Sequence, residues 1–161
     1  MKKILILIFL NSYIVADVDW SNTNECKLPD YSPFVNKIVN EMTLEQKVGQ
    51  IIMPEINSIS AAQVKKFQIG TILNGGGGFP NQNKNSDIQD WKDLSESYYD
   101  ESPVVSGIKI PILWGTDAVH GHNNVIGATI FPHNIGLGST RNPNLIKEIG
   151  SAVAKEVAST G

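Results

Sequence analysis

The sequence of 161 residues is short of cysteine, of positive charge and of long apolar runs. Cys26 is its single cysteine, which excludes an internal disulfide framework and a cysteine-based zinc site. The formal net charge of −3 disfavours nucleic acid or an anionic membrane as the main partner, because both require a basic patch. An apolar content of 41% with 18% charged residues is typical of a globular chain, and the length suits one modest domain.

The longest apolar run stands at the N-terminus and is too short to span a bilayer. Lys2 and Lys3 precede residues 4–10 (ILILIFL), and Ala16 offers a small residue before a cleavage point. This order is typical of a secretory signal peptide, although a buried N-terminal strand or helix is the alternative. We therefore expect residues 1–16 to be removed and the protein to be secreted or periplasmic, with no membrane attachment after cleavage.

The motifs of several enzyme classes are missing as well. Residues 75–78 are four consecutive glycines, but the lysine and hydroxyl residue of a phosphate-binding P-loop do not follow them. No G-x-S-x-G elbow occurs, and Cys26 lies far in sequence from any histidine, so a serine or cysteine nucleophile has no support. The glycines either let the backbone approach a ligand closely or form a plain turn.

After a polar, irregular lead-in at residues 17–32, helical patterns alternate with short apolar runs. Helices are predicted after Ser32-Pro33, after Thr43, and after Asn142-Pro143, where residues that favour helix starts stand, and also over residues 58–68 and 86–99. Strands are predicted at residues 50–55, 69–74 and 110–115, and residues 126–140 are predicted to be irregular. Apolar strands alternating with helices indicate an α/β fold with a parallel sheet. Because a closed (β/α)8 barrel takes about 250 residues, the chain is either a small open α/β domain or the front part of something larger.

Functional residues of parallel α/β folds lie on the loops that follow the strands. Three such loops carry Glu55, the glycines of residues 75–78, and Asp117 with His120 and His122. The Asp117-x-x-His120-x-His122 spacing is compatible with a metal-dependent hydrolase, but the pattern favours two histidines that hydrogen-bond within a buried loop and hold it in shape. The Asp117 carboxylate could accept hydrogen bonds from two neighbouring sugar hydroxyls or cap backbone N–H groups.

Three segments together carry a resemblance to a known family. Residues 112–143 (ILWGTDAVHGHNNVIGATIFPHNIGLGSTRNP) resemble the N-terminal domain of glycoside hydrolase family three, the β-glucosidase and exo-glucanase group. Residues 42–50 (MTLEQKVGQ) look like its opening helix, and residues 69–80 (IGTILNGGGGFP) look like its second strand and glycine loop. The resemblance implies that residues 33–161 are the N-terminal part of the barrel domain, namely the first three β/α units of a (β/α)8 TIM-like barrel that is incomplete in this chain.

The same resemblance implies a retaining glycosidase that removes terminal β-D-glucosyl residues from β-glucosides or β-glucan oligosaccharides. Asp117 is similar to the family's aspartate that binds hydroxyls of the non-reducing glucosyl unit, and His120 and His122 then shape the loop. No metal or other cofactor is implied, and Arg141 matches a recurrent arginine to which no ligand contact is assigned.

The family's lysine–histidine stretch and the strand that carries its nucleophile are not found in these residues. Retention requires two carboxyl groups about 5–5.5 Å apart, and the resemblance places neither of them here. We therefore expect the chain to be inactive without the remainder of its barrel and C-terminal domain. A metal-dependent hydrolase and a non-catalytic sugar-binding module are the alternatives.

Overall fold

The structure, a computed structural model, describes residues 29–161. The predicted signal peptide, Cys26 and most of the predicted lead-in lie outside the described residues, and residues 32–161 form one compact unit. Among the helices of residues 29–161, none has the length and apolar character that crossing a bilayer requires. The elements in chain order are α1 (Ser32–Glu41), α2 (Leu44–Gln50), η2 (Ile56–Ser58), α3 (Ala61–Phe67), β1 (Thr71–Asn74), η3 (Pro80–Gln82), α4 (Ile88–Asp100), β2 (Val104–Val105), β3 (Ile108–Lys109), β4 (Leu113–Thr116), α5 (Asn134–Ser139) and α6 (Pro143–Ala158).

Helices begin where the sequence marks a helix start. Before α2, the Thr43 hydroxyl accepts from the backbone N–H of Gln46 at 3.2 Å, and the Gln46 side chain accepts from the Thr43 N–H at 3.0 Å. This reciprocal capping satisfies two N–H groups that the helix itself cannot pair. At α6, the Asn142 side chain accepts from the Leu145 N–H at 3.1 Å, and proline takes the first helical position. Both predicted helix starts are confirmed.

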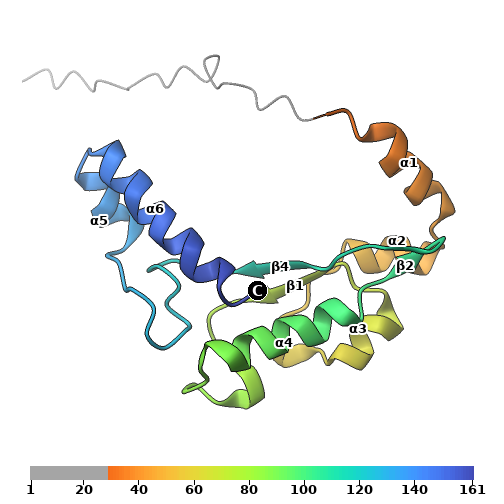
Figure 1. Cartoon of the computed structure of the whole chain (residues 1–161), viewed down its shortest axis with the longest axis horizontal. Coiled ribbons are helices and arrows are strands. Elements are labelled where there is room, and N and C mark those ends of the chain that lie inside the picture. The colour runs from red at the N-terminus through yellow and green to blue at the C-terminus, as the bar shows by residue number, and fades with distance from the viewer. Residues whose placement is uncertain (1–28) are drawn as a thin grey trace, which may run out of the picture. The chain divides into compact units, whose positions relative to one another are not determined.

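Strands β1 and β4 pair in parallel, and they lie side by side at the centre of Figure 1. The register places Ile72 opposite Trp114 and Asn74 opposite Thr116. Since both strands end at the same level, their carboxyl ends form one edge of the sheet. These two predicted strands are confirmed, and their pairing is parallel, as the sequence predicted for the sheet.

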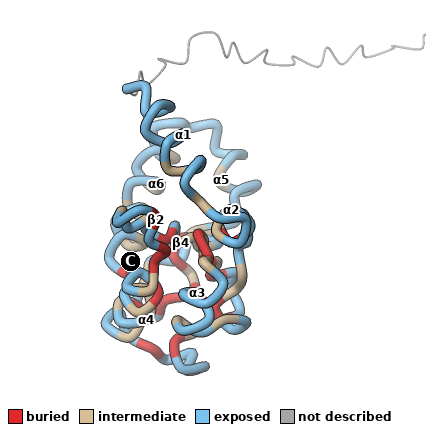
Figure 2. The backbone as a smooth tube through the Cα atoms, turned by 90° about the vertical axis from the view of Figure 1, so that its right-hand side faces the viewer, coloured by how far each residue is buried: buried red, intermediate tan, exposed pale blue. Residues whose placement is uncertain are grey.

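The core lies between this sheet and helices α3 and α4. Ile72 and Val64 have no exposed surface, Trp91 is 1% exposed and Tyr98 is 3% exposed. Figure 2 shows the buried segments gathered around β4 and α4, whereas the tube along α1, α2, α5 and α6 is mostly exposed. Helices α3 and α4 therefore cover one face of the sheet, and their packing fixes the position of the strand ends.

The prediction of a buried strand at residues 50–55 is wrong. Gln50 is the last residue of α2, and residues 51–55 form a turn and an irregular segment, in which Ile51 is 84% exposed and Met53 is 47% exposed. Their pairing with β1 is limited to a hydrogen bond from the Leu73 N–H to the Pro54 carbonyl at 2.9 Å and a single parallel bridge at Glu55. An apolar run becomes a buried strand only when neighbours cover it, and in the described residues this run has a neighbouring strand on one side alone.

A hairpin and a short helix are among the elements that were not predicted. Strands β2 and β3 form a two-residue antiparallel pair across Ser106 and Gly107, whose φ angles of 50° and 82° suit the tight turn of a hairpin. Helix α5 lies within residues 126–140, which were predicted to be irregular, and the His133 ring nitrogen caps it by accepting from the Ile135 N–H at 3.2 Å. A helix of six residues with two glycines has too little apolar periodicity to be recognised in the sequence.

Candidate active-site edge

The loops that carry the predicted site residues meet at the carboxyl edge of the sheet. Asn74 and Thr116, the last residues of β1 and β4, are direct partners across the strands. The bridge between Glu55 and Leu73 brings the third loop to the same edge. This edge is where parallel α/β folds bind their ligands, so the structure brings together all three loops that the sequence analysis selected.

Asp117 is the first residue after β4. Its backbone N–H donates to the Asn74 carbonyl at 3.1 Å, which continues the pairing of the strands by one residue. The residue is exposed, and within residues 29–161 its carboxylate takes no hydrogen bond or ion pair. The main chain of Asp117 is therefore fixed, while both carboxylate oxygens are free to accept from a ligand.

His120 joins the loop to the segment before α5. Its Nδ1 lies 3.1 Å from the Phe131 carbonyl oxygen, and the two histidine rings of His120 and His133 are 5.4 Å apart edge to face. Because a carbonyl oxygen can only accept, Nδ1 carries the proton in this contact. The Phe131 N–H donates in return to the His120 carbonyl at 2.9 Å, so His120 holds two segments of the loop together.

His122 joins the same loop to the end of α6. The ring is 2% exposed, and its Nε2 lies 2.8 Å from the Thr160 hydroxyl oxygen. That hydroxyl donates its only proton to the Val157 carbonyl at 2.9 Å, so Nε2 must be the donor to Thr160. Nδ1 then carries a lone pair, and it is buried without a partner. Burial lowers the pKa of His122, and the neighbouring Glu156 opposes this effect.

The neutral state of His122 gives an expected pH dependence of stability. A histidine whose pKa is lowered on folding binds its proton more readily when unfolded, so stability is complete above the ordinary pKa of 6.5 and is lost as pH falls below it. We expect the free energy of unfolding to fall between pH 7.5 and pH 5.5 by at most about 1.4 kcal/mol per pH unit, since one proton is involved.

Urea unfolding of the wild type and of H122Q across this range measures the effect. The two proteins differ only at residue 122, so the difference between their slopes isolates His122. Equal slopes would contradict the assignment of a buried neutral ring.

The hypothesis of a metal site at Asp117, His120 and His122 finds no coordinating set. Each histidine is committed to its own structural contact, and within residues 29–161 no three histidine, cysteine, aspartate or glutamate side chains are grouped to hold a metal ion. Both histidines instead hydrogen-bond to protein atoms, His120 to Phe131 and His122 to Thr160, and their role in shaping the loop stays a prediction.

Glu55 is bound locally. One carboxylate oxygen accepts from the Asn57 N–H at 2.7 Å, which caps η2, and the other is buried without a partner. Glu55 also lies beside the glycine loop, where a Cβ at Gly78 would collide with its Oε1 and with Ile56. Burial raises the pKa of Tyr98, and the Glu55 charge adds to this effect. The Glu55 side chain therefore packs against the glycine loop at Gly78.

The glycine loop is a shaped segment. Gly76 has a φ of +92°, and Gly78 has no room for a side chain, so each requires glycine for its own reason.

Trp114 lies on the helix-covered face, 6.1 Å from the Tyr98 ring, and belongs to the core rather than to the ligand edge. Arg141 is exposed between α5 and α6 with a φ of +50°.

Sequence reasoning missed Asn74 and Asn124. Both are buried, at 0% and 7% exposure, and the Asn124 amide donates to the Asn74 side-chain oxygen at 3.4 Å. The available signal was the position of Asn74 at the end of an apolar strand and of Asn124 at the end of the motif that follows Asp117. A buried polar side chain at a strand end is typical of a site that needs fixed geometry.

Comparison with known proteins identifies the family. Residues 43–161 match the model of the glycosyl hydrolase family 3 N terminal domain. The chain is 27% identical to a lysosomal beta glucosidase of Dictyostelium discoideum over 176 aligned residues, which cover 99% of this chain and 21% of the relative. It is 26% identical to a periplasmic beta-glucosidase of Salmonella typhimurium, over 80% of this chain and 15% of the relative.

A solved structure agrees with these matches. The crystal structure of an exo-1,3/1,4-beta-glucanase from a Pseudoalteromonas species is similar to this chain with a TM-score of 0.75 and 47% sequence identity, over 83% of this chain and 17% of that protein. The chain thus spans about a fifth or less of the length of the relatives that it matches. The predicted fold class is confirmed: the chain carries α/β units of a TIM-barrel-like domain, and the described residues form no closed barrel. The chain belongs to glycosyl hydrolase family 3 and carries sequence of that family's N-terminal domain.

Proposed function

We propose that the chain forms the first part of the barrel of a secreted, retaining β-glucosidase, and that Asp117 binds hydroxyls of the terminal glucosyl unit. The observation that carries the proposal is the free Asp117 carboxylate at the edge where the loops after β1 and β4 meet the segment of Glu55. The names of the relatives, two β-glucosidases and an exo-1,3/1,4-β-glucanase, support a β-glucoside or β-glucan oligosaccharide as substrate.

In this proposal, hydrolysis with retention of the anomeric configuration depends on residues that lie outside this chain. A nucleophile and an acid/base must lie about 5–5.5 Å apart, whereas Asp117 is a lone free carboxylate and Glu55 is engaged with the Asn57 N–H. In this proposal, residues 33–161 bind and orient the sugar, and both catalytic carboxyls come from outside residues 1–161. A carboxylate that accepts from two neighbouring hydroxyls fixes the position of the sugar ring without a metal or other cofactor.

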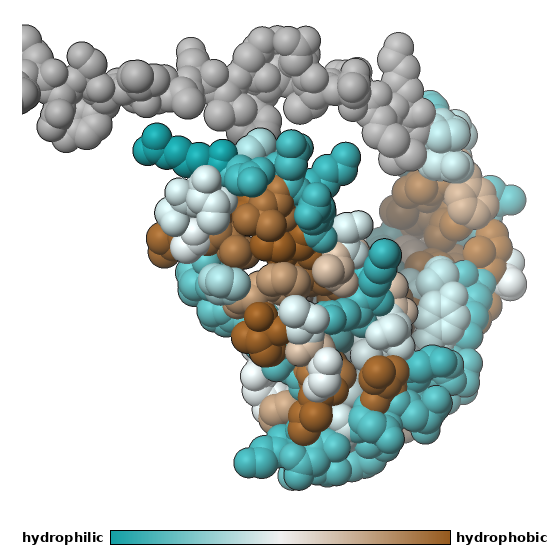
Figure 3. All heavy atoms as spheres, turned by 60° about the vertical axis from the view of Figure 1, so that its left-hand side comes forward, coloured by the Kyte–Doolittle hydropathy of each residue, from teal (hydrophilic) through white to brown (hydrophobic). Residues whose placement is uncertain are grey.

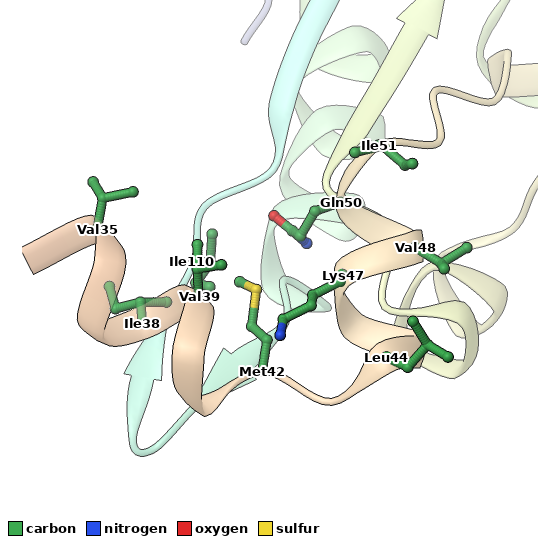
Figure 4. A pocket seen from close by; sticks show the side chains of 10 residues that line it. All are labelled: Val35, Ile38, Val39, Met42, Leu44, Lys47, Val48, Gln50, Ile51 and Ile110. Carbon is green, nitrogen blue, oxygen red and sulfur yellow. The ribbon is translucent and has the colours of Figure 1, made fainter. Parts of the chain in front are cut away.

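Exposed apolar surface supports the need for further barrel units. A groove of about 710 Å³ lies between α1 and α2, and the side chains in Figure 4 line it: Val35, Ile38, Val39, Met42, Leu44, Lys47, Val48, Gln50, Ile51 and Ile110. On the strand β4, Leu113 is 68% exposed, and Figure 3 shows further apolar side chains on the face that it draws. Apolar surface of this extent is normally covered, so in this proposal the remainder of the barrel and a C-terminal domain are the partners of these residues.

The proposed location is secreted or periplasmic. The relatives include a periplasmic and a lysosomal β-glucosidase, both of compartments that are reached by export from the cytosol. The signal-peptide pattern of residues 1–16 agrees with this location.

The proposal predicts that the 161-residue chain alone does not hydrolyse an aryl β-glucoside. Release of nitrophenol from nitrophenyl β-glucoside is the measurement, with the periplasmic beta-glucosidase of Salmonella typhimurium as the active control. We expect no release above the buffer rate, because in the proposal both catalytic carboxyls lie outside the chain. Turnover by the wild-type chain that D117A or E55Q abolishes would place a catalytic carboxyl within these residues and overturn the proposal.

A further inference from the structure

A chain of side-chain amides connects the two loops beside Asp117. The His120 N–H donates to the Asn123 side-chain oxygen at 3.3 Å, the Asn123 amide donates to the Asn124 oxygen at 3.1 Å, and the Asn124 amide donates to the Asn74 oxygen at 3.4 Å. The chain therefore runs from the loop after β4 to the last residue of β1.

Asn124 also lies near the glycine loop. A Cβ added at Gly76, which has none of its own, would lie 3.7 Å from the Asn124 Oδ1 and 4.0 Å from its Nδ2. The side chain of Asn124, on the loop that carries Asp117, is therefore a close neighbour of the glycine loop.

Asn74 fixes Asp117 from a second direction. Its backbone carbonyl accepts from the Asp117 N–H at 3.1 Å, while its side-chain oxygen accepts from Asn124. One residue therefore anchors both the main chain of Asp117 and the loop that follows it.

The burial of this amide pair argues for a role in orientation. Asn74 is 0% exposed and its Nδ2 has no hydrogen-bond partner, which is an unfavourable state for a buried donor. Two apolar side chains could fill the same space without this cost, but they would not fix direction, because hydrophobic contact is non-directional. Hydrogen bonds do fix direction, and they do so here at the proposed sugar-binding edge.

We propose that Asn74 and Asn124 are positioning residues, which hold the Asp117 carboxylate and the glycine loop at the spacing required to bind a glucosyl unit. This inference rests on the proposed function, because it requires Asp117 to bind the sugar. It assigns to these two asparagines a contribution to affinity that acts through Asp117, without contact with the ligand.

The test compares glucose affinity in variants of the intact protein, by which we mean the longer protein of the proposal, in which the remainder of the barrel completes residues 33–161. N124A removes both amide contacts and should weaken glucose binding about tenfold. N124D should keep the affinity within about threefold of the wild type, since an aspartate at 124 still accepts from Asn123, and the Asn74 amide can rotate to donate its unpartnered Nδ2 to the new carboxylate. N144A is the matched control on the exposed surface of α6 and should change nothing.

Affinity is measured by titration calorimetry at a temperature where circular dichroism finds every variant folded. This condition separates positioning from stability, because a residue that only stabilises the fold would lower the melting temperature and leave the affinity of the folded protein unchanged. If N124A does not fold, N123A at a partly exposed position interrupts the same chain and should weaken binding about threefold.

The outcomes are distinguishable. The inference is overturned if the folded N124A protein binds glucose with wild-type affinity, or if N123A does so where it replaces N124A. It is also overturned if N124D loses as much affinity as N124A. If the wild type itself does not bind glucose, the proposed function fails, and the inference fails with it.

Discussion

Replacement of Asp117 by alanine should weaken the binding of glucose by the intact protein about 100-fold. The carboxylate lies at the carboxyl edge of the sheet with no protein partner within residues 29–161, so in the proposal its two oxygens serve the ligand alone. Two charge-assisted hydrogen bonds would be lost, and each contributes more than a bond between neutral groups. Titration calorimetry with glucose measures the change directly.

Two variants control this experiment. D117N keeps one acceptor oxygen and the shape of the side chain, and it should lose about tenfold in affinity. D100A removes an aspartate of α4 that is 82% exposed and should have no effect on binding. Equal affinity in D117A and the wild type would show that Asp117 does not bind the sugar, whatever the family resemblance implies.

Replacement of Gly121 by alanine should lower the free energy of unfolding by at least about 3 kcal/mol. Gly121 has a φ of +77°, and a Cβ there would collide with the Thr129 carbonyl oxygen and the Phe131 ring. A backbone oxygen cannot move aside as a flexible side chain can, so the loop between Asp117 and α5 must open. Urea unfolding followed by circular dichroism measures the loss.

Gly127 provides the matched control for the collision. Its φ of +92° is also in the left-handed region, but a Cβ at this position would meet no atom within 4 Å. G127A should therefore cost only the backbone strain, about 1–2 kcal/mol. If G121A and G127A lower the free energy of unfolding by the same amount, the close packing of Gly121 against residues 129 and 131 does not contribute to stability.

The sequence predicted the features that depend on local chemistry. The capping box at Thr43 and the cap at Asn142 are set by side chains a few residues away, so they are recognisable without tertiary structure. The order of helices and strands also predicted a parallel sheet, and the observed parallel pairing of β1 with β4 places Asp117 at the carboxyl end of the strands. The role of Asp117 itself stays a prediction.

The sequence could not predict features that depend on what lies across the sheet. Residues 50–55 have the composition of a buried strand, but composition does not say whether a neighbour covers them. Trp114 stands next to the site in sequence yet faces the core, because side chains alternate along a strand and only the register decides which face is covered. The amide contact between Asn74 and Asn124 joins residues that are 50 positions apart, which no spacing rule connects.

The most direct measurement of the central claim is a crystal structure of the intact protein with glucose bound. We expect a glucose at the edge formed by the carboxyl ends of β1 and β4, with both Asp117 oxygens within hydrogen-bond distance of two adjacent hydroxyls. We also expect His120 and His122 to keep their contacts with Phe131 and Thr160 in the complex. A glucose bound elsewhere, with the Asp117 carboxylate still without a ligand, would contradict the account.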